Sequence, residues 1–323
     1  MILVTGANGF LGQHLLSRLS GHKLSLLGRH EPDFPIKHRF TKATLDEDSD
    51  YSSALQDCDI VIHSAARAHI MNDLSKDPFS DYMKVNTAGT LNLARQAVKC
   101  GVKRFIFISS IKVNGEDSPR NKPFTPNSPH APQDYYGVSK SKAELQLLQL
   151  AEKSAMDVVI IRPTLVYGPH VKANFASLMK LVSKGIPLPF GCIKNNKRSL
   201  VSVDNLVDLV VTCIDHPKAA NEVFLVSDDH DVSTREMVHH MAQALDKPTW
   251  QVPVPVWCYK LAGKVFNKSD VVDRLTGSLQ VDISQTKETL GWVPPQSLQE
   301  GFKLTAEAFL QSKKSNGKHD PFN

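Results

Sequence analysis

The sequence predicts an α/β protein, built on a doubly wound parallel sheet with a smaller, discontinuous second domain toward the C-terminus. Two observations lead to this fold class. Short apolar runs alternate with amphipathic stretches through the first half of the chain, which is typical of consecutive βαβ units. The first apolar run leads directly into a turn with three glycines, as strands do where a parallel sheet binds a ligand.

The expected strands are short, apolar and rich in Val, Ile and Phe, as strands buried on both faces of a sheet are. They cover residues 2–5, 24–27, 59–63, 104–110 and 158–162. Leu11, Leu15, Leu16 and Leu19 recur at helical spacing after the first strand. Further helices are expected at residues 85–98 and 143–153. Strands and helices therefore alternate in the order that a doubly wound sheet requires.

The pattern changes after Pro163, where prolines accumulate. Apolar runs still recur at residues 199–203 and 222–226, and we expect them to return to the sheet. The sequence therefore predicts a first domain of residues 1–165 with returns near 199–227. It predicts a second domain within residues 166–312, and a flexible polar tail at residues 313–323.

Composition favours an ordinary globular protein. The 323 residues are 41% hydrophobic and 22% charged, with a net charge of +5 and no long basic run, which argues against a nucleic-acid partner. The five cysteines form no CxxC pair, so we expect reduced thiols, no metal site and a cytoplasmic location. No apolar run approaches the roughly 20 residues that span a bilayer, and residues 1–4 are expected to form a strand.

The glycine turn is the first candidate site. Gly6, Gly9 and Gly12 would allow a tight turn, close approach of the backbone to a pyrophosphate, and close packing of helix on strand. The helix that follows would present free N–H groups to the phosphates. A Rossmann-type dinucleotide site is therefore expected, and it also includes the intervening Asn8, Phe10 and Leu11.

The end of the second expected strand indicates which dinucleotide binds. An acidic residue there would hold the ribose 2′-hydroxyl of NAD. The strand instead runs into Gly28 and Arg29, and no carboxylate occurs before Glu31. A guanidinium can form a bidentate pair with a 2′-phosphate, so the sequence favours NADP(H), with NAD as the alternative and a solvated Arg29 as the ordinary interpretation.

Tyr136 and Lys140 are the candidate catalytic pair, because they lie four residues apart on one helix face. A lysine ammonium beside a phenol would lower the phenol pKa toward the working range, and the phenol could then act as acid and base. Ser110 ends the preceding strand, where a serine could hydrogen-bond the reacting oxygen. The neighbouring Ser109 is expected only to cap a turn.

Three further residues lie near the expected cofactor. Ala65 belongs to a run of small residues that would leave room for the nicotinamide. Asn86 could either connect backbone to Lys140 or be purely structural. His63, at the end of its strand, is expected to be packed and not catalytic.

In the order of these motifs, the chain resembles the extended short-chain dehydrogenase/reductase family over roughly residues 1–300, particularly its nucleotide-sugar epimerase, dehydratase and reductase branch. The resemblance implies Ser110, Tyr136 and Lys140 as the catalytic triad and places Pro163 beside the cofactor. Asn114 departs from the tyrosine that is usual in the family's Ser-x-x-Val-Tyr-Gly segment, so a substrate role at that position is in doubt.

The resemblance also implies a substrate side. Arg198 matches the family arginine that contacts the diphosphate, and Arg274 is a weaker second candidate. Asn174 and Pro189 lie in segments similar to those that hold the nucleotide. The family often forms dimers through the helices that bear Asn86 and Tyr136, so a homodimer is expected.

Two enzyme functions share these residues. The favoured one is an NADP(H)-dependent reductase of a UDP-4-keto-6-deoxy-hexosamine in surface-polysaccharide synthesis, because Arg29 indicates an exchangeable NADPH. The alternative is a UDP-hexose or UDP-N-acetylhexosamine 4-epimerase that retains its cofactor. A 4,6-dehydratase is disfavoured because Ile111 and Lys112 replace the usual Asp-Glu pair. A non-catalytic dinucleotide sensor is the remote alternative, since Tyr136 and Lys140 are both present.

Overall fold

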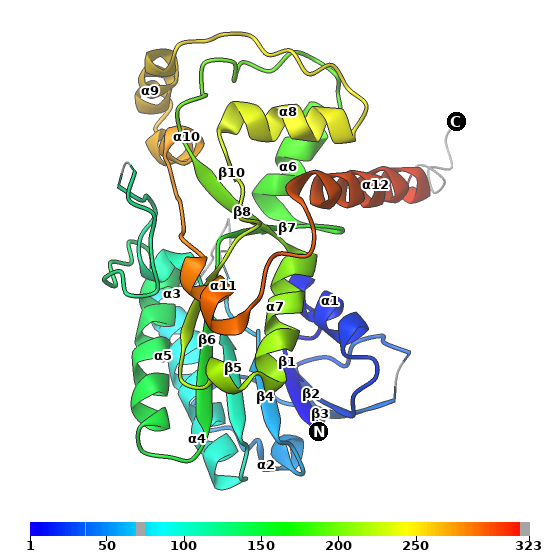
Figure 1. The fold of residues 1–323 in the computed structure, drawn as a ribbon, viewed down its shortest axis with the longest axis vertical. Coiled ribbons are helices and arrows are strands. Elements are labelled where there is room, and N and C mark those ends of the chain that lie inside the picture. Colours follow the sequence, from blue (N-terminus) through cyan, green and yellow to red (C-terminus); the bar gives the residue numbers. More distant parts are fainter. Residues whose placement is uncertain (36, 69–74, 120, 317–323) are drawn as a thin grey trace.

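A seven-stranded, all-parallel sheet forms the larger part of the fold in this computed structural model (Figure 1). The structure describes residues 1–35, 37–68, 75–119 and 121–316. The strand order β3-β2-β1-β4-β5-β6-β9 confirms the predicted Rossmann-type fold class. The strands are β1 (Ile2–Thr5), β2 (Leu24–Gly28), β3 (His38–Lys42), β4 (Ile60–His63), β5 (Arg104–Ile108), β6 (Asp157–Pro163) and β9 (Val223–Val226).

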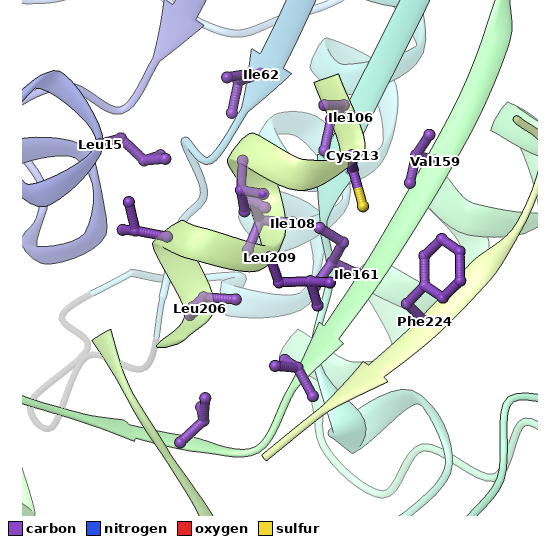
Figure 2. Packing of buried hydrophobic residues seen from close by; sticks show 14 of the residues in the cluster. Leu15, Ile62, Ile106, Ile108, Val159, Ile161, Leu206, Leu209, Cys213 and Phe224 are labelled. Atoms are coloured by element: carbon purple, nitrogen blue, oxygen red, sulfur yellow. The ribbon is translucent and has the colours of Figure 1, made fainter. Parts of the chain in front are cut away.

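Helices cover both faces of this sheet. On one face, α1 (Phe10–Arg18) and α7 (Val203–Asp215) pack on the side chains that point toward them from β1, β4, β5 and β6. Figure 2 shows Leu209 of α7 lying against Ile108 and Ile161 in this layer. The other face is covered by α2 (Ser52–Leu55), α4 (Thr90–Lys99) and α5 (Tyr135–Ala151). Burial on both faces explains why the strand sequences are almost wholly apolar.

A second, smaller part of the molecule surrounds a three-stranded sheet in the order β10-β8-β7. Its apolar cluster joins Tyr167, Phe175 and Phe302. Its elements are β7 (Leu165–Tyr167), α6 (Ala173–Val182), β8 (Arg198–Ser202), β10 (Asp231–Val232), α8 (Thr234–Ala244), α9 (Val256–Val265), α10 (Ser269–Thr276) and α12 (Leu298–Asn316).

Short helical segments complete the fold. They are α3 (Pro78–Tyr82), a π-helix at Met83–Gly89, 3₁₀ turns at Ile111–Val113 and Pro217–Ala219, and α11 (Ser284–Leu290). The helix predicted at residues 85–98 therefore begins as a π-helix that continues into α4. Among the described residues, no helix has the length and apolar character needed to cross a membrane.

Three details differ from the sequence predictions. The edge strand β3 was not predicted, because its residues are polar and only partly buried. Residues 199–203 do not return to the large sheet: β8 pairs with β7 and β10, because β9 already occupies the edge beside β6. Lys313 is helical and its Nζ donates to Ser183 Oγ at 2.9 Å, so the predicted tail begins later. Residues 317–323 lie outside the described part, and the domain boundaries stay a prediction.

Candidate active site

The glycine turn lies between β1 and α1, at the point where the strand order of the sheet reverses. Gly6 has φ +77°, a conformation that favours glycine, and Gly9 N donates to Gly6 O at 2.8 Å. A Cβ on Gly6 would lie 2.7 Å from Ala65 N, and one on Gly12 would lie 2.0 Å from Gly6 O. Glycine is therefore required at both positions for the backbone to pack this closely.

Replacing Gly12 by Ala is expected to abolish dinucleotide binding. The new methyl group would overlap the Gly6 carbonyl, so α1 would have to move away from β1 and open the turn. Fluorescence titration with NADH and NADPH measures the effect. Gly21→Ala is the control, because Gly21 has no positive φ and a Cβ there would meet no atom within 4 Å. Unchanged affinity in Gly12→Ala would contradict the assignment of this turn to the cofactor.

A cavity of about 590 Å³ opens above this turn. Its lining includes five of the residues predicted to contact the cofactor, namely Gly6, Asn8, Gly9, Arg29 and Ala65. The other predicted cofactor residues do not line this cavity, and they are Phe10, Leu11, Gly12, Asn86, Tyr136, Lys140 and Pro163. Asn8 Nδ2 donates to His30 O at 2.7 Å, which ties the glycine turn to the loop after β2. Arg29 is exposed at the rim, where it could meet a ribose phosphate. The glycine cradle and this cavity fit a dinucleotide.

Ser110, Tyr136 and Lys140 lie where β5 ends and α5 begins. Ser110 is half-buried and its Oγ accepts a hydrogen bond from Lys112 N at 3.2 Å, so Ser110, and not Ser109, caps the turn. Ser109 is buried, and its hydroxyl has no hydrogen-bond partner among the described residues. The expectation that Ser109 is the cap was wrong because Ser109 directly follows β5 and still pairs with the neighbouring strand β6, its N donating to Ile161 O at 2.8 Å.

The Tyr136–Lys140 pair differs from the sequence expectation in its electrostatics. Lys140 is 1% exposed, its Nζ donates to Ile108 O at 2.8 Å, and Nζ lies 5.9 Å from the Tyr136 ring centre. Burial lowers the pKa of Lys140 to about 7. Burial, reinforced by the Asp134 carboxylate, raises the pKa of Tyr136 well above its usual value. The lysine therefore does not lower the phenol pKa in this structure, because desolvation dominates both groups.

This burial gives the stability of the protein a defined pH dependence. In the unfolded chain, the pKa of a lysine is about 10.4, whereas burial lowers the pKa of Lys140 to about 7 in the fold. Between these values the unfolded chain binds the extra proton, so stability rises with pH. Lys140→Met should therefore raise the free energy of unfolding near neutral pH, by an amount that shrinks toward about pH 10.

Urea denaturation of the dinucleotide-free protein across this range measures the difference. Lys142→Met is the matched control, because Lys142 lies on the exposed face of the same helix. A difference between parent and Lys140→Met that does not change with pH would contradict the assigned protonation of Lys140.

A charged pair connects the Ser110 turn to the helix that carries Tyr136. Lys112 Nζ donates to Asp134 Oδ2 at 2.6 Å, and Asp134 Oδ1 caps α5 by accepting from Gly137 N at 2.6 Å. A Cβ on Gly137 would lie 2.8 Å from Lys112 O, so the two segments are in close contact. The sequence analysis missed this positioning role, although an Asp directly before a helix is a recognisable capping signal.

Asn86 and His63, which were both expected near the cofactor, have structural partners. Asn86 lies in the π-helix and bonds the backbone N and O of Arg67 and the Ser139 hydroxyl, and not Lys140. His63 is buried between the hydroxyls of Thr5 and Thr90, at 2.7 and 2.8 Å. Burial lowers the pKa of His63 to about 3, so it stays neutral. The prediction that His63 is packed is confirmed.

Asn114 belongs to a buried polar network and not to the cavity. Its Oδ1 accepts from Arg162 Nη1 at 3.1 Å. The same guanidinium contacts Glu144 through both carboxylate oxygens, at 2.6 and 3.0 Å, and His130 at 2.8 Å. Arg162 and Glu144 are almost fully buried. The departure from the family tyrosine therefore serves packing between β6 and α5.

On the substrate side, the structure brings Arg198 and Arg274 together. Arg198 begins β8 and its Nη1 donates to Arg274 O at 2.6 Å. Arg274 is exposed on α10. Asn174 on α6 and Pro189 after it are also exposed, and Pro163 is buried at the end of β6. The substrate roles of these residues stay predictions. Within the described ranges, no cluster of three or more His, Cys, Asp or Glu residues could hold a metal ion.

The fold, the glycine cradle and the cavity above it define a dinucleotide-binding α/β enzyme. The model of the NAD dependent epimerase/dehydratase family matches residues 2–227, and the chain belongs to this family, within the extended short-chain dehydrogenase/reductases. It is 63% identical over 314 residues to a UDP-glucose 4-epimerase of Vibrio cholerae, with 96% of each chain covered.

Two further comparisons cover nearly the whole chain. An N-acetyl-alpha-D-glucosaminyl-diphospho-ditrans,octacis-undecaprenol 4-epimerase of Escherichia coli O157:H7 is 29% identical, covering 98% of this chain and 97% of the relative. The solved structure of MoeE5 in complex with UDP-glucose and NAD has a TM-score of 0.76 at 23% identity, covering 97% and 99%. This structural likeness supports the fold alone.

Proposed function

We propose that the protein is a 4-epimerase of a UDP-hexose, which inverts the configuration at C4 of the sugar. The identity of 63% along almost the full length of a UDP-glucose 4-epimerase is the observation that carries this proposal. It favours the epimerase alternative over the 4-keto-6-deoxy-hexosamine reductase that Arg29 suggested. The reductase prediction depended on one exposed side chain, whereas the similarity to the epimerase covers 96% of this chain.

A nicotinamide dinucleotide, when bound, supplies reversible hydride transfer at the sugar C4. The residues of this chain transfer the proton of the C4 hydroxyl and orient the reacting groups. The Tyr136 side chain, ionised to its phenolate, would take the proton from the C4 hydroxyl and later return it, and Ser110 Oγ would hydrogen-bond the same oxygen. Lys140 Nζ, held by Ile108 O, orients the site beside Tyr136. Gly6, Gly9, Gly12, Asn8 and Ala65 form the cradle for the dinucleotide.

The raised pKa of Tyr136 has a functional consequence in this scheme. The phenol stays protonated in the cofactor-free protein, because burial penalises the phenolate. A positive charge in the cavity would favour the phenolate, so binding of an oxidised nicotinamide would bring the phenol closer to its working range. Proton abstraction by Tyr136 is thereby linked to occupation of the dinucleotide cavity. We propose NAD(H) as the resident dinucleotide, with NADP(H) as the alternative that Arg29 favours.

The test incubates the purified protein, without added cofactor, with UDP-galactose, UDP-N-acetylgalactosamine or their gluco isomers. Chromatography of the nucleotide sugars is expected to show interconversion of a C4 pair, and denaturation should release a tightly bound dinucleotide. Stoichiometric consumption of added NADPH with a UDP-4-keto-6-deoxy-hexosamine, and no interconversion, would favour the reductase instead.

Arg198→Ala is expected to raise KM for the UDP-sugar roughly tenfold or more, with a smaller effect on kcat. A guanidinium that holds the diphosphate in both ground and transition states contributes uniform binding, and its loss appears in KM. Steady-state kinetics measure the change, and Arg235→Ala offers a comparison arginine in the same part of the fold. An unchanged KM for Arg198→Ala would remove this residue from the substrate site.

A further inference from the structure

The segment of residues 247–268 and the helix α10 that follows it carry an unusual surface. Large apolar side chains are exposed along this stretch, which contains two of the three tryptophans of the chain. Trp257 is 65% exposed, Val265 70% and Phe266 72%. The exposed apolar residues of α9 and its C-terminal end are Trp257, Leu261, Val265 and Phe266, and we call them the α9 patch. Trp250, Val252 and Val271 are exposed on the flanking segments. Isolated exposed apolar residues are ordinary, but a local group of this kind indicates a binding surface.

The α9 patch belongs to a folded helix and not to a loosely attached segment. Gly263, on the inner face of α9, is buried, and a Cβ there would lie 2.8 Å from Val272 of α10. The Tyr259 ring stacks on Phe190 with the ring centres 6.5 Å apart. Because the inner face is already packed, the exposed face of α9 is available to another surface.

Charge identifies the kind of surface. Residues 247–268 contain four lysines and no Asp or Glu, and the lysines are Lys247, Lys260, Lys264 and Lys268. The helix α10 adds Asp270, Asp273 and Arg274, so cationic side chains still outnumber acidic ones on the whole surface. Lys260 and Lys264 are exposed on α9 and alternate at helical spacing with Trp257, Leu261 and Val265. Apolar and cationic side chains therefore share one face. This is the pattern of helices that lie in the headgroup region of an anionic bilayer, where Trp and Lys side chains are favoured.

A second copy of the chain fits this surface less well. An isologous contact through α9 would bring the lysines of both copies together, with fewer acidic groups than lysines to neutralise them, namely Asp270 and Asp273 of α10. Like charges at such a contact oppose association. Anionic phospholipid headgroups complement the same lysines, and the apolar side chains can enter the acyl boundary.

We propose that the α9 patch, with Lys260, Lys264 and Lys268, docks the enzyme reversibly on the surface of an anionic lipid bilayer. Figure 1 shows α9 near the end of the molecule away from the parallel sheet, with α10 between α9 and the sheet, so α9 can approach a flat surface. The helix α10, which follows α9, carries Arg274, and the carbonyl oxygen of Arg274 accepts a hydrogen bond from Arg198 Nη1. Docking therefore places the predicted diphosphate end of the substrate site close to the membrane. The proposal does not depend on the sugar that the enzyme converts.

Vesicle flotation of the full-length protein tests this proposal. Vesicles of phosphatidylglycerol mixed with phosphatidylcholine should carry the protein to the top of the gradient, and pure phosphatidylcholine vesicles should carry much less. Binding should weaken as salt is raised, because screening reduces the attraction of the lysines to the headgroups. The double variant Lys260→Glu/Lys264→Glu should lose at least tenfold in partitioning, since each lysine near an anionic surface contributes about fivefold.

Leu261→Glu removes the apolar contribution and should also reduce partitioning, and Val293→Glu is the matched control at an exposed apolar residue outside the α9 patch. Dinucleotide titration of each variant reports whether the fold is intact. Equal flotation of Leu261→Glu, of the double variant and of the parent would overturn the proposal. So would a dimer in light scattering that Leu261→Glu dissociates, because a second copy would then cover the α9 patch.

Discussion

Tyr136→Phe is expected to lower kcat by about 100- to 10,000-fold, the usual contribution of a positioned acid–base group. The substitution removes only the hydroxyl, so the ring contacts with Tyr82 and Lys140 remain. KM should change little, because the lost interaction acts on the proton in transit and not on substrate binding. Steady-state kinetics with the UDP-sugar give both values.

The neighbouring tyrosine provides the matched control. Tyr135 is 54% exposed, and its ring packs against Phe79 on the surface. Tyr135→Phe should retain parental kcat. Dinucleotide affinity should be preserved in both variants, which separates loss of chemistry from loss of fold. Comparable turnover in Tyr136→Phe and the parent would show that another group transfers the proton.

Glu144→Gln is expected to lower the free energy of unfolding by about 3–5 kcal/mol, because it leaves the buried Arg162 guanidinium without its charged partner. Glutamine keeps the volume, so the loss reports charge and hydrogen bonding, not a cavity. Urea denaturation at neutral pH measures it. His130 and Asn114 still bond the guanidinium but carry no full negative charge to neutralise it.

An exposed ion pair provides the comparison. Lys103 Nζ lies 3.0 Å from Asp59 Oδ1, and the lysine side chain is 78% exposed. Lys103→Ala should cost at most about 1 kcal/mol, since solvent screens such pairs. A loss of similar size in both variants would contradict the structural importance of the Arg162 network.

The sequence predicted the parts of the fold that depend on local pattern. The strands from β1 to β6, other than β3, were predictable because each is a short apolar run buried on both faces. β3 was missed because its side chains are only partly buried, so its position depends on pairing with β2 and not on its own pattern. The pairing of β8 also depends on tertiary contacts, because an apolar run does not specify which of two sheets it joins.

The same limit applies to the site. The spacing of Gly6 and Gly9 marked residues that line the cavity, whereas Tyr136 and Lys140 do not line it, and their place at the reacting end stays a prediction. The electrostatics were not predictable, because desolvation depends on what covers a side chain. The resemblance to the family showed that Asn114 replaces a tyrosine, but only the structure shows that Asn114 Oδ1 accepts a hydrogen bond from Arg162.

The fate of the hydrogen on C4 tests the proposed epimerase most directly. A UDP-hexose that carries deuterium at C4 is incubated with the purified protein in ordinary water, with no added cofactor, and the products are measured by mass spectrometry and NMR. The proposal predicts that the C4 epimer forms and retains deuterium at C4, because the same hydrogen leaves and returns within one site. Failure to form the epimer, or an epimer whose C4 deuterium has been replaced by hydrogen, would contradict it.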